Sequence, residues 1–144
     1  MSSKIVVGYD GSAESRRALD FALEKAGPEN GTVVVAHILE WSPYSFLTPE
    51  ELEERHKRRG EELARAEEAL IAPLKSELDG STVTVETVIK YGHVADTLCA
   101  IANDAKASGI VVGRKGDTGL AARVFGSVAG TLAQCAPVPC TIVP

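Results

Sequence analysis

Residues 110–116 read Ile-Val-Val-Gly-Arg-Lys-Gly, a short apolar run that passes directly into a glycine-containing loop. After nine more residues, the pair Gly126-Ser127 opens a segment with helical character. Glycine lets backbone N–H groups converge on a ligand, and the first turn of a helix adds unpaired N–H donors with a positive dipole end. The stretch therefore predicts a strand, an anion-binding loop and a helix. Its spacing is neither that of the Walker loop nor that of the dinucleotide fingerprint Gly-x-Gly-x-x-Gly.

The same alternation of apolar run and helix continues along the whole chain. Short continuous apolar runs favour strands that are buried on both faces, as in a parallel sheet. We expect strands at Lys4–Gly8, Thr32–Leu39, Thr82–Ile89, Ile110–Val112 and Cys140–Val143, the third nearer a sheet edge because it alternates more cleanly. Helices are expected after Ser12, after Thr48, from about Val94 to Ala105 and from about Ser127 to Gln134. This order predicts an α/β fold, an open five-stranded parallel sheet with helices on both faces.

Length and composition bound the class of protein. The chain has 144 residues, a length that predicts a single domain spanning 1–144. Hydrophobic residues make up 44% of it, which is ordinary for a globular protein. A net charge of −5 argues against nonspecific binding to nucleic acid or to an anionic membrane. No apolar run approaches the roughly 20 residues that span a bilayer. The N-terminus passes straight into a strand-like run, so we expect no signal peptide and a cytoplasmic location.

The middle of the chain carries a long charged helix. Thr48-Pro49-Glu50-Glu51 combines a capping residue, proline at the first helical position and glutamate three residues after the cap. The dozen residues that follow are mostly charged, which is typical of a solvated helix face; a protein-docking role is the alternative. Pro73 lies inside the apolar stripe that comes next, and it should kink or end the helix near Ala72.

Two loops follow strands that can lie side by side. Tyr9-Asp10-Gly11-Ser12 comes after the first strand, and the glycine loop comes after the fourth. Open parallel sheets bind ligands beyond the carboxyl ends of their strands, where the strand order reverses. If the first and fourth strands are neighbours, the two loops face each other across one crevice. Asp10 is then either a helix cap or a ligand contact, and the two roles are compatible.

These residues together resemble the universal stress protein family, in its ATP-binding branch. The family's nucleotide motif, Gly-x2-Gly-x9-Gly-Ser/Thr, is matched by Gly113, Gly116, Gly126 and Ser127. Residues 5–12, 91–95 and 126–140 are also similar to the family's opening strand, its turn before the third helix and its ending. The stretch 41–80 is the least diagnostic part. Gly109, where the family commonly has an acidic residue, and Asp117, next to Gly116, depart from the pattern.

The resemblance implies a strand order of 3-2-1-4-5 and an adenine nucleotide as ligand: ATP, or ADP or AMP, with or without Mg²⁺. Gly113 and Gly116 would approach the ribose and phosphates, and Gly126 and Ser127 would bind the terminal phosphates. The other implied positions are Asp10 beside the adenosine and any metal, the Ile38 backbone at adenine, and Val112 and Val128 as pocket lining. Independently of the family, Arg114, Lys115 and Arg123 could offset phosphate charge.

The resemblance also implies a homodimer, in which the fifth strands, Cys140–Val143 here, pair across a two-fold axis. An unpaired apolar edge at this strand would otherwise invite uncontrolled pairing. The implied function is that of an ATP-binding regulator of the stress response, acting on a protein partner that the sequence does not name.

Nothing in the sequence identifies a catalytic set. No Ser/His/Asp or Cys/His arrangement can be read from it, and His37, His56 and His93 lack the spacing of metal ligands. Cys99, Cys135 and Cys140 are interpreted as small buried hydrophobic residues. Two further hypotheses stay open: a slow Mg²⁺-dependent ATP hydrolase in which Asp10 holds the metal, and a nucleotide-free interaction module. A phosphoacceptor role for Asp10, as in response-regulator receivers, is discounted because the accompanying acidic pair and lysine are missing.

Overall fold

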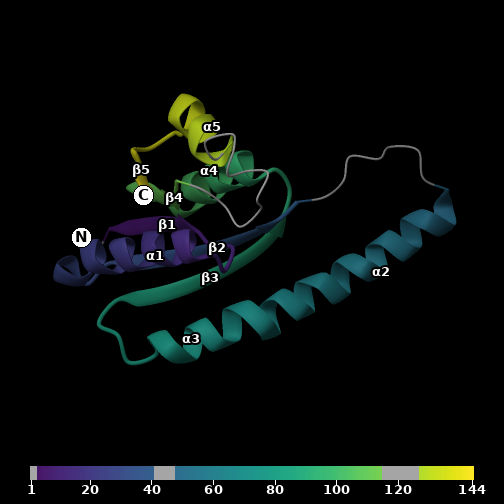
Figure 1. Ribbon diagram of the computed structural model, residues 1–144, viewed down its shortest axis with the longest axis horizontal. Coiled ribbons are helices and arrows are strands. Elements are labelled where there is room, and N and C mark those ends of the chain that lie inside the picture. Colours follow the sequence, from purple (N-terminus) through teal and green to yellow (C-terminus); the bar gives the residue numbers. More distant parts are fainter. Residues whose placement is uncertain (1–2, 41–47, 115–126) are drawn as a thin grey trace.

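The computed structural model describes residues 3–40, 48–114 and 127–144. Its strands form one parallel five-stranded sheet in the order β3-β2-β1-β4-β5 (Figure 1). They are β1 Lys4–Gly8, β2 Thr32–Leu39, β3 Thr84–Tyr91, β4 Gly109–Gly113 and β5 Cys140–Val143. The expected fold and strand order are confirmed, and β3 does lie at an edge.

Within the described residues, five α-helices connect and cover these strands: α1 Ala13–Ala26, α2 Pro49–Ala66, α3 Ala72–Leu78, α4 Val94–Ala105 and α5 Ser127–Cys135. The helix start at Thr48 is confirmed, because the Thr48 side chain and Glu51 form a complete capping box. β3 begins two residues later than expected. The hydroxyl of Ser81 accepts a hydrogen bond of 3.2 Å from the Val83 N–H, which holds Val83 in the preceding turn.

Hydrophobic side chains pack on both faces of the sheet. Neighbouring residues of the central strands point to opposite sides: Val6 and Ile110 belong to the cluster beneath α4 and α5, whereas Val7 and Val111 belong to the cluster beneath α1 and α3. Figure 1 shows the two layers, with α4 and α5 on one side of the sheet and α1 on the other. Strands buried on both faces explain why their sequences read as continuous apolar runs.

Pro73 does not end the helix in which it lies. The segment Glu67–Ile71 (η2) is a π-helical turn, and the Ala72 N–H bonds back to the Glu67 carbonyl. Proline has no N–H, and its ring clashes with the carbonyl four residues earlier. The wider π turn changes the hydrogen-bonding register just before the proline, so α2, η2 and α3 form one continuous rod (Figure 1). The sequence predicted a kink or an end near Ala72; the α-helix is interrupted there by the π turn and continues as α3.

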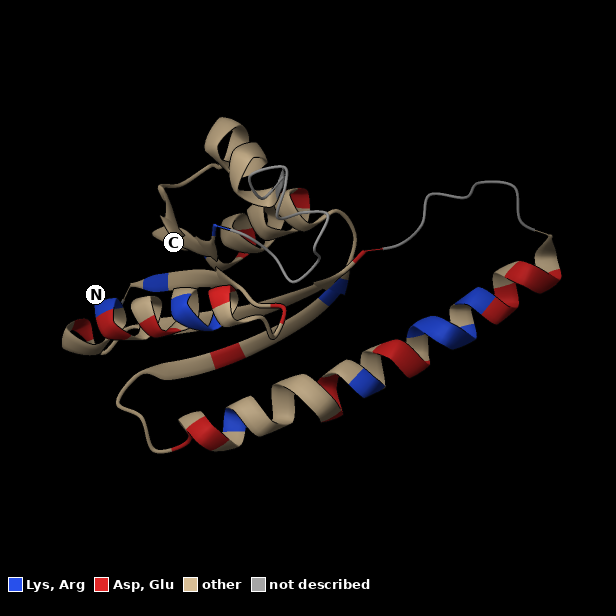
Figure 2. Cartoon of the chain, viewed as in Figure 1, with Lys and Arg blue, Asp and Glu red and all other residues tan. Residues whose placement is uncertain are grey.

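The outer part of this rod stands away from the sheet. No residue of α2 is buried, and Figure 2 shows acidic and basic residues distributed along it. This confirms the interpretation of residues 51–62 as a solvated helix face. The loop expected at 40–47, with Trp41, Tyr44 and Phe46, lies outside the described residues apart from Glu40.

The interpretation of the cysteines needs a correction. Cys99 and Cys140 are half-buried, but Cys135 is exposed, because it is the last residue of α5, whose buried residues include Ala129 and Leu132. Within the part of the chain that the structure describes, no helix is both long and apolar enough to cross a bilayer.

Candidate functional site

The loop between β1 and α1 is held in shape by its own side chains. Oδ1 of Asp10 accepts hydrogen bonds from the Ser12 N–H at 2.9 Å and from the Ser12 hydroxyl at 2.5 Å. The Ser12 oxygen in turn accepts a bond of 3.1 Å from the Ser15 N–H, so Ser12 is the residue that caps α1. Asp10 is not the capping residue itself, but its carboxylate holds Ser12 in the capping position. Its carboxylate is exposed and fixed beside the first turn of the helix.

Gly11 completes this turn and brings the α2–α3 rod against it. Its φ of +83° lies in the left-handed region, which favours glycine. A Cβ at Gly11 would stand 2.9 Å from Cδ1 of Leu70, a residue of the π-helical turn. The rod therefore forms a wall behind the β1–α1 loop.

The end of β4 packs directly on the start of α1. A Cβ built at Gly113 would lie 3.0 Å from the carbonyl carbon and oxygen of Glu14, in the first turn of that helix. Because β1 and β4 are hydrogen-bonded neighbours, both loops leave the same edge of the sheet side by side. A side chain at Gly113 would therefore crowd the backbone of α1, whether or not a ligand is bound.

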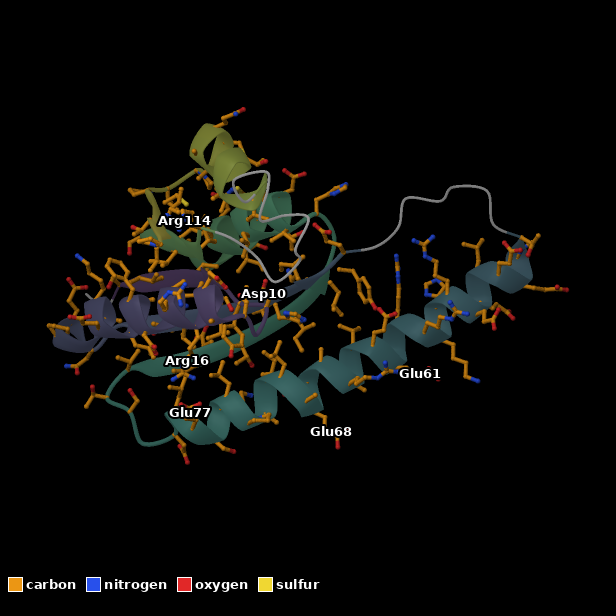
Figure 3. All side chains as sticks on the ribbon, in the orientation of Figure 1. Asp10, Arg16, Glu61, Glu68, Glu77 and Arg114 are labelled. Atoms are coloured by element: carbon orange, nitrogen blue, oxygen red, sulfur yellow. The ribbon has the colours of Figure 1, made fainter. Side chains whose placement is uncertain are left out.

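The other predicted site residues lie near this edge. Val112 is buried, and Ile38 and Val128 are half-buried against the cluster beneath α4 and α5. Arg114 is exposed, and its backbone N–H donates to the Val143 carbonyl at 2.9 Å (Figure 3). Gly116 and Gly126, with Lys115, Asp117 and Arg123, lie outside the described residues, as does the side chain of Ser127, whose backbone begins α5.

His37 is a site residue that the sequence interpretation passed over. Nδ1 of its ring lies 2.8 Å from the carbonyl oxygen of Tyr9, so the ring joins β2 to the β1–α1 loop. A carbonyl only accepts hydrogen bonds, so Nδ1 is the donor in this contact. Its position one residue before Ile38, near the end of a strand, was the available signal.

A hollow of about 320 Å³ opens at this carboxyl edge, on the side of α4 and α5. Its lining comes from the residue after β2, the first turn of α4 and the first turns of α5: Glu40, His93, Val94, Ala95, Asp96, Val128 and Thr131. Two carboxylates on its wall disfavour a phosphate there. Its mixture of apolar and polar groups suits an uncharged ring or sugar instead.

Tyr91, the last residue of β3, ties α2 to the sheet. Its hydroxyl donates a short hydrogen bond to Oε2 of Glu62, and the guanidinium of Arg59 lies 5.0 Å from the centre of its ring. Partial burial and the Glu62 carboxylate raise the pKa of Tyr91 to about 12. The phenol therefore stays protonated as the donor at physiological pH.

The part of the chain that the structure describes holds no group of three or more His, Cys, Asp or Glu side chains placed to bind a metal ion. Asp10 is a single carboxylate, which suits Mg²⁺ only when phosphate oxygens and waters supply the remaining ligands.

Comparison with known proteins places this arrangement in a family. A model described as the universal stress protein family matches residues 1–144. A universal stress protein of Mycolicibacterium smegmatis is 30% identical over 96% of this chain, which spans about half (47%) of that protein's length. Universal stress protein UspA from Lactobacillus plantarum is 20% identical and superposes with a TM-score of 0.84, covering 99% of this chain and 97% of that one.

A further solved structure, a universal stress protein in complex with cAMP, is 26% identical, with a TM-score of 0.66 over 99% of this chain and 97% of that one. The order of the strands, the pair of loops at the carboxyl edge and these matches agree with one another. The chain belongs to the universal stress protein family.

Proposed function

We propose that this protein binds an adenine nucleotide in the crevice between the β1–α1 loop and the loop after β4. The observation that carries the proposal is the contact between Gly113 and the first turn of α1, which puts the two loops at one edge of the sheet. Open α/β sheets bind their ligands at such an edge. The relative solved with cAMP supports an adenine nucleotide as the class of ligand.

In this proposal, each side of the crevice has its own chemistry. The Asp10 carboxylate is already fixed by Ser12, and it accepts hydrogen bonds from ribose hydroxyls or shares a Mg²⁺ ion with the phosphates. Arg114 stands on the opposite loop, where its charge favours phosphate. Ile38, Val112 and Val128 provide apolar lining, and Gly113, Gly116, Gly126 and Ser127 provide backbone and hydroxyl donors.

The hollow beside Val128 is the proposed position of the base or the sugar. Glu40 and Asp96 on its wall would repel phosphate, so the phosphates are assigned to the Arg114 side. This division predicts that the charge of the nucleotide affects binding chiefly through Arg114 and the residues that follow it.

We propose that the protein acts as a regulator that responds to ATP, ADP or AMP and signals to a protein partner, without relying on hydrolysis.

Two copies of the chain would pair through β5, an edge strand in this chain whose Ile142 is 38% exposed. A dimer mass by light scattering at micromolar concentration is the expected result. A monomer mass would contradict this mode of pairing and leave nucleotide binding untouched.

The test of nucleotide binding is a thermal shift series with ATP, ADP and AMP, each with and without Mg²⁺. Ligand at 100 times its dissociation constant stabilises a fold by about 2.7 kcal/mol. For a domain of this size we expect a rise of roughly 5–11 °C in melting temperature. No shift with any of the three nucleotides would overturn the proposal.

Variants then test the site itself. Asp10→Asn should reduce the shift, whereas Asp104→Asn, the same change near the last turn of α4 at the opposite end of the sheet, should not. Equal shifts in both variants would show that Asp10 does not contact the nucleotide.

Phosphate release from ATP is followed in the same samples. No release of phosphate over hours agrees with a regulator, and sustained release would make the protein a slow hydrolase instead.

A further inference from the structure

The peptide unit between Tyr9 and Asp10 is held at both of its polar ends. Its carbonyl oxygen, which belongs to Tyr9, accepts a hydrogen bond of 2.8 Å from Nδ1 of His37 on β2. Its N–H, which belongs to Asp10, donates to the hydroxyl oxygen of Ser15 on α1 at 3.3 Å. A peptide unit is planar, so bonds to its two opposite ends fix its orientation between the sheet and the helix.

The bond from His37 lies just beyond the end of the ladder between β1 and β2. The paired register of the two strands ends at Gly8 and Ala36, and the Tyr9 N–H adds one more bond of 2.9 Å to the Ala36 carbonyl. From there the chain turns towards α1. The half-buried imidazole of His37 supplies a side-chain donor at this point, so the loop stays tied to β2 after the strands have ended.

The same loop carries the carboxylate that the proposed function places at the nucleotide. Oδ1 of Asp10 accepts hydrogen bonds from the N–H and the hydroxyl of Ser12, which fix the side chain relative to the first turn of α1. The bond from His37 fixes the backbone from which that side chain leaves, and it does so relative to the sheet. The carboxylate is therefore oriented by contacts that come from two different elements.

We propose that His37 is a positioning residue for nucleotide binding, which acts through the Tyr9–Asp10 peptide unit on the Asp10 carboxylate. The inference rests on the proposed function, in which Asp10 meets the ribose hydroxyls or a shared Mg²⁺ ion. A binding group that is held in place before the ligand arrives loses less freedom when the ligand binds, so the affinity is higher. Without the donor on His37, the Tyr9 carbonyl would turn to water and Asp10 would have to be ordered at each binding event.

The test compares two side chains of similar shape that differ in one donor. Asn carries an amide N–H₂ close to the position of Nδ1 in His, whereas Leu carries a methyl group there. Dissociation constants for ATP, ADP and AMP are measured by titration calorimetry on the full chain, with and without Mg²⁺, at a temperature at which circular dichroism shows each variant to be folded. His37→Leu should weaken binding by about tenfold, the effect of one lost hydrogen bond, and His37→Asn should restore most of the affinity.

A matched control makes the same change elsewhere. His56 is an exposed residue of α2, so His56→Leu should bind nucleotide as the unmodified chain does.

Two further measurements separate positioning from a purely structural role. In a chain that already carries Asp10→Asn, His37→Leu should have a much smaller effect, because both substitutions act through one carboxylate. Ser15→Ala removes the acceptor at the other end of the peptide unit and should weaken binding as well. Alanine suits a helix, and the Ser12 carbonyl keeps its bond of 3.0 Å from the Arg16 N–H, so Ser15→Ala provides the test if His37→Leu does not fold.

The possible failures of the two proposals differ. No binding of ATP, ADP or AMP by the unmodified chain would overturn the proposed function and this inference with it. Binding that both His37→Leu and Ser15→Ala leave unchanged would overturn this inference alone, even where the melting temperature falls. Equal losses of affinity in His37→Leu and His37→Asn would overturn it too, as would fully additive losses when His37→Leu is combined with Asp10→Asn.

Discussion

α1 and α2 are the two longest helices in the part of the chain that the structure describes, and they differ in how much of each is buried. α1 has 14 residues, five of them buried: Ser15, Ala18, Leu19, Ala22 and Ala26. α2 has 18 residues, and none is buried. Both are capped at the N-terminus by a hydroxyl side chain, Ser12 in one and Thr48 in the other. A cap and helical propensity are therefore sufficient to place either helix, but only α1 is part of the core.

The two helices also contact the carboxyl edge of the sheet in different ways. α1 touches it through its first turn, where Ser12 binds Asp10 and Glu14 meets Gly113. The α2–α3 rod touches it through single side chains, with Leu70 against Gly11 and Glu62 against Tyr91. Changes in α1 should thus affect stability and the site together, whereas changes in the outer part of α2 should leave both intact.

The largest effect is expected from Leu19→Ala in α1. The Leu19 side chain is fully buried beneath the sheet, so its truncation removes apolar contacts and leaves a cavity. We expect a loss of about 2–5 kcal/mol in the free energy of unfolding, measured by chemical denaturation. A loss below about 1 kcal/mol would mean that α1 moves to close the cavity. It would contradict the conclusion that α1, unlike α2, is a fixed part of the core.

The sequence was sufficient to predict the strands and the helix starts, because the signals that specify them are local. Short apolar runs such as Lys4–Gly8 predict buried strands, and capping patterns such as Thr48–Glu51 predict where helices begin; both were confirmed. Whether Pro73 kinks or ends the helix could not be decided from the sequence, since the response to a proline depends on packing. Leu74, one residue later, is buried in the core and holds the rod in place, so the backbone adopts a π turn instead of ending.

The site was less predictable, because its contacts connect distant parts of the chain. Asp10 and Gly113 could be identified from the residues around them, but the contact of Gly113 with Glu14 depends on the packing of α1. For His37 the sequence offered only its place near the end of β2, since its partner, the Tyr9 carbonyl, is 28 residues away. Distances of this kind follow from the order of the strands, which here came from a family resemblance.

The second prediction compares the two caps. Ser12→Ala removes both the acceptor for the Ser15 N–H and the donor to Asp10, in a buried position. We expect a loss of about 1–2 kcal/mol in the free energy of unfolding. Thr48→Ala should instead leave that free energy unchanged and increase hydrogen exchange in the first turn of α2, because no buried residue links α2 to global unfolding. Equal losses of global stability would contradict the comparison.

The third prediction concerns the ion pair that joins α1 to α3. Arg16 donates two hydrogen bonds to the Glu77 carboxylate, at 3.0 and 2.9 Å, and this contact lowers the pKa of Glu77 below its ordinary value of 4.5. A carboxylate with a lowered pKa in the folded state stabilises that state above its unfolded pKa, and it loses this effect as the pH falls through the folded value.

Glu77→Gln should therefore bring a small loss of stability at neutral pH that disappears in acid, since both side chains are partly exposed and screened by solvent. Denaturation at a series of pH values measures this, with the exposed α1 residue Glu24→Gln as the control. A loss of equal size at neutral and acidic pH would show that Glu77 acts through packing and not through its charge.

The smallest effect is expected from Leu52→Ala in α2, which is the counterpart of Leu19→Ala. Leu52 is 47% exposed, so truncating it returns little apolar surface to water, and alanine is the better helix former. We expect no change in the free energy of unfolding beyond about 0.5 kcal/mol, the usual range for surface substitutions. A large loss would mean that Leu52 is covered in solution, and a simultaneous fall in molecular mass by light scattering would identify the cover as a second copy of the chain.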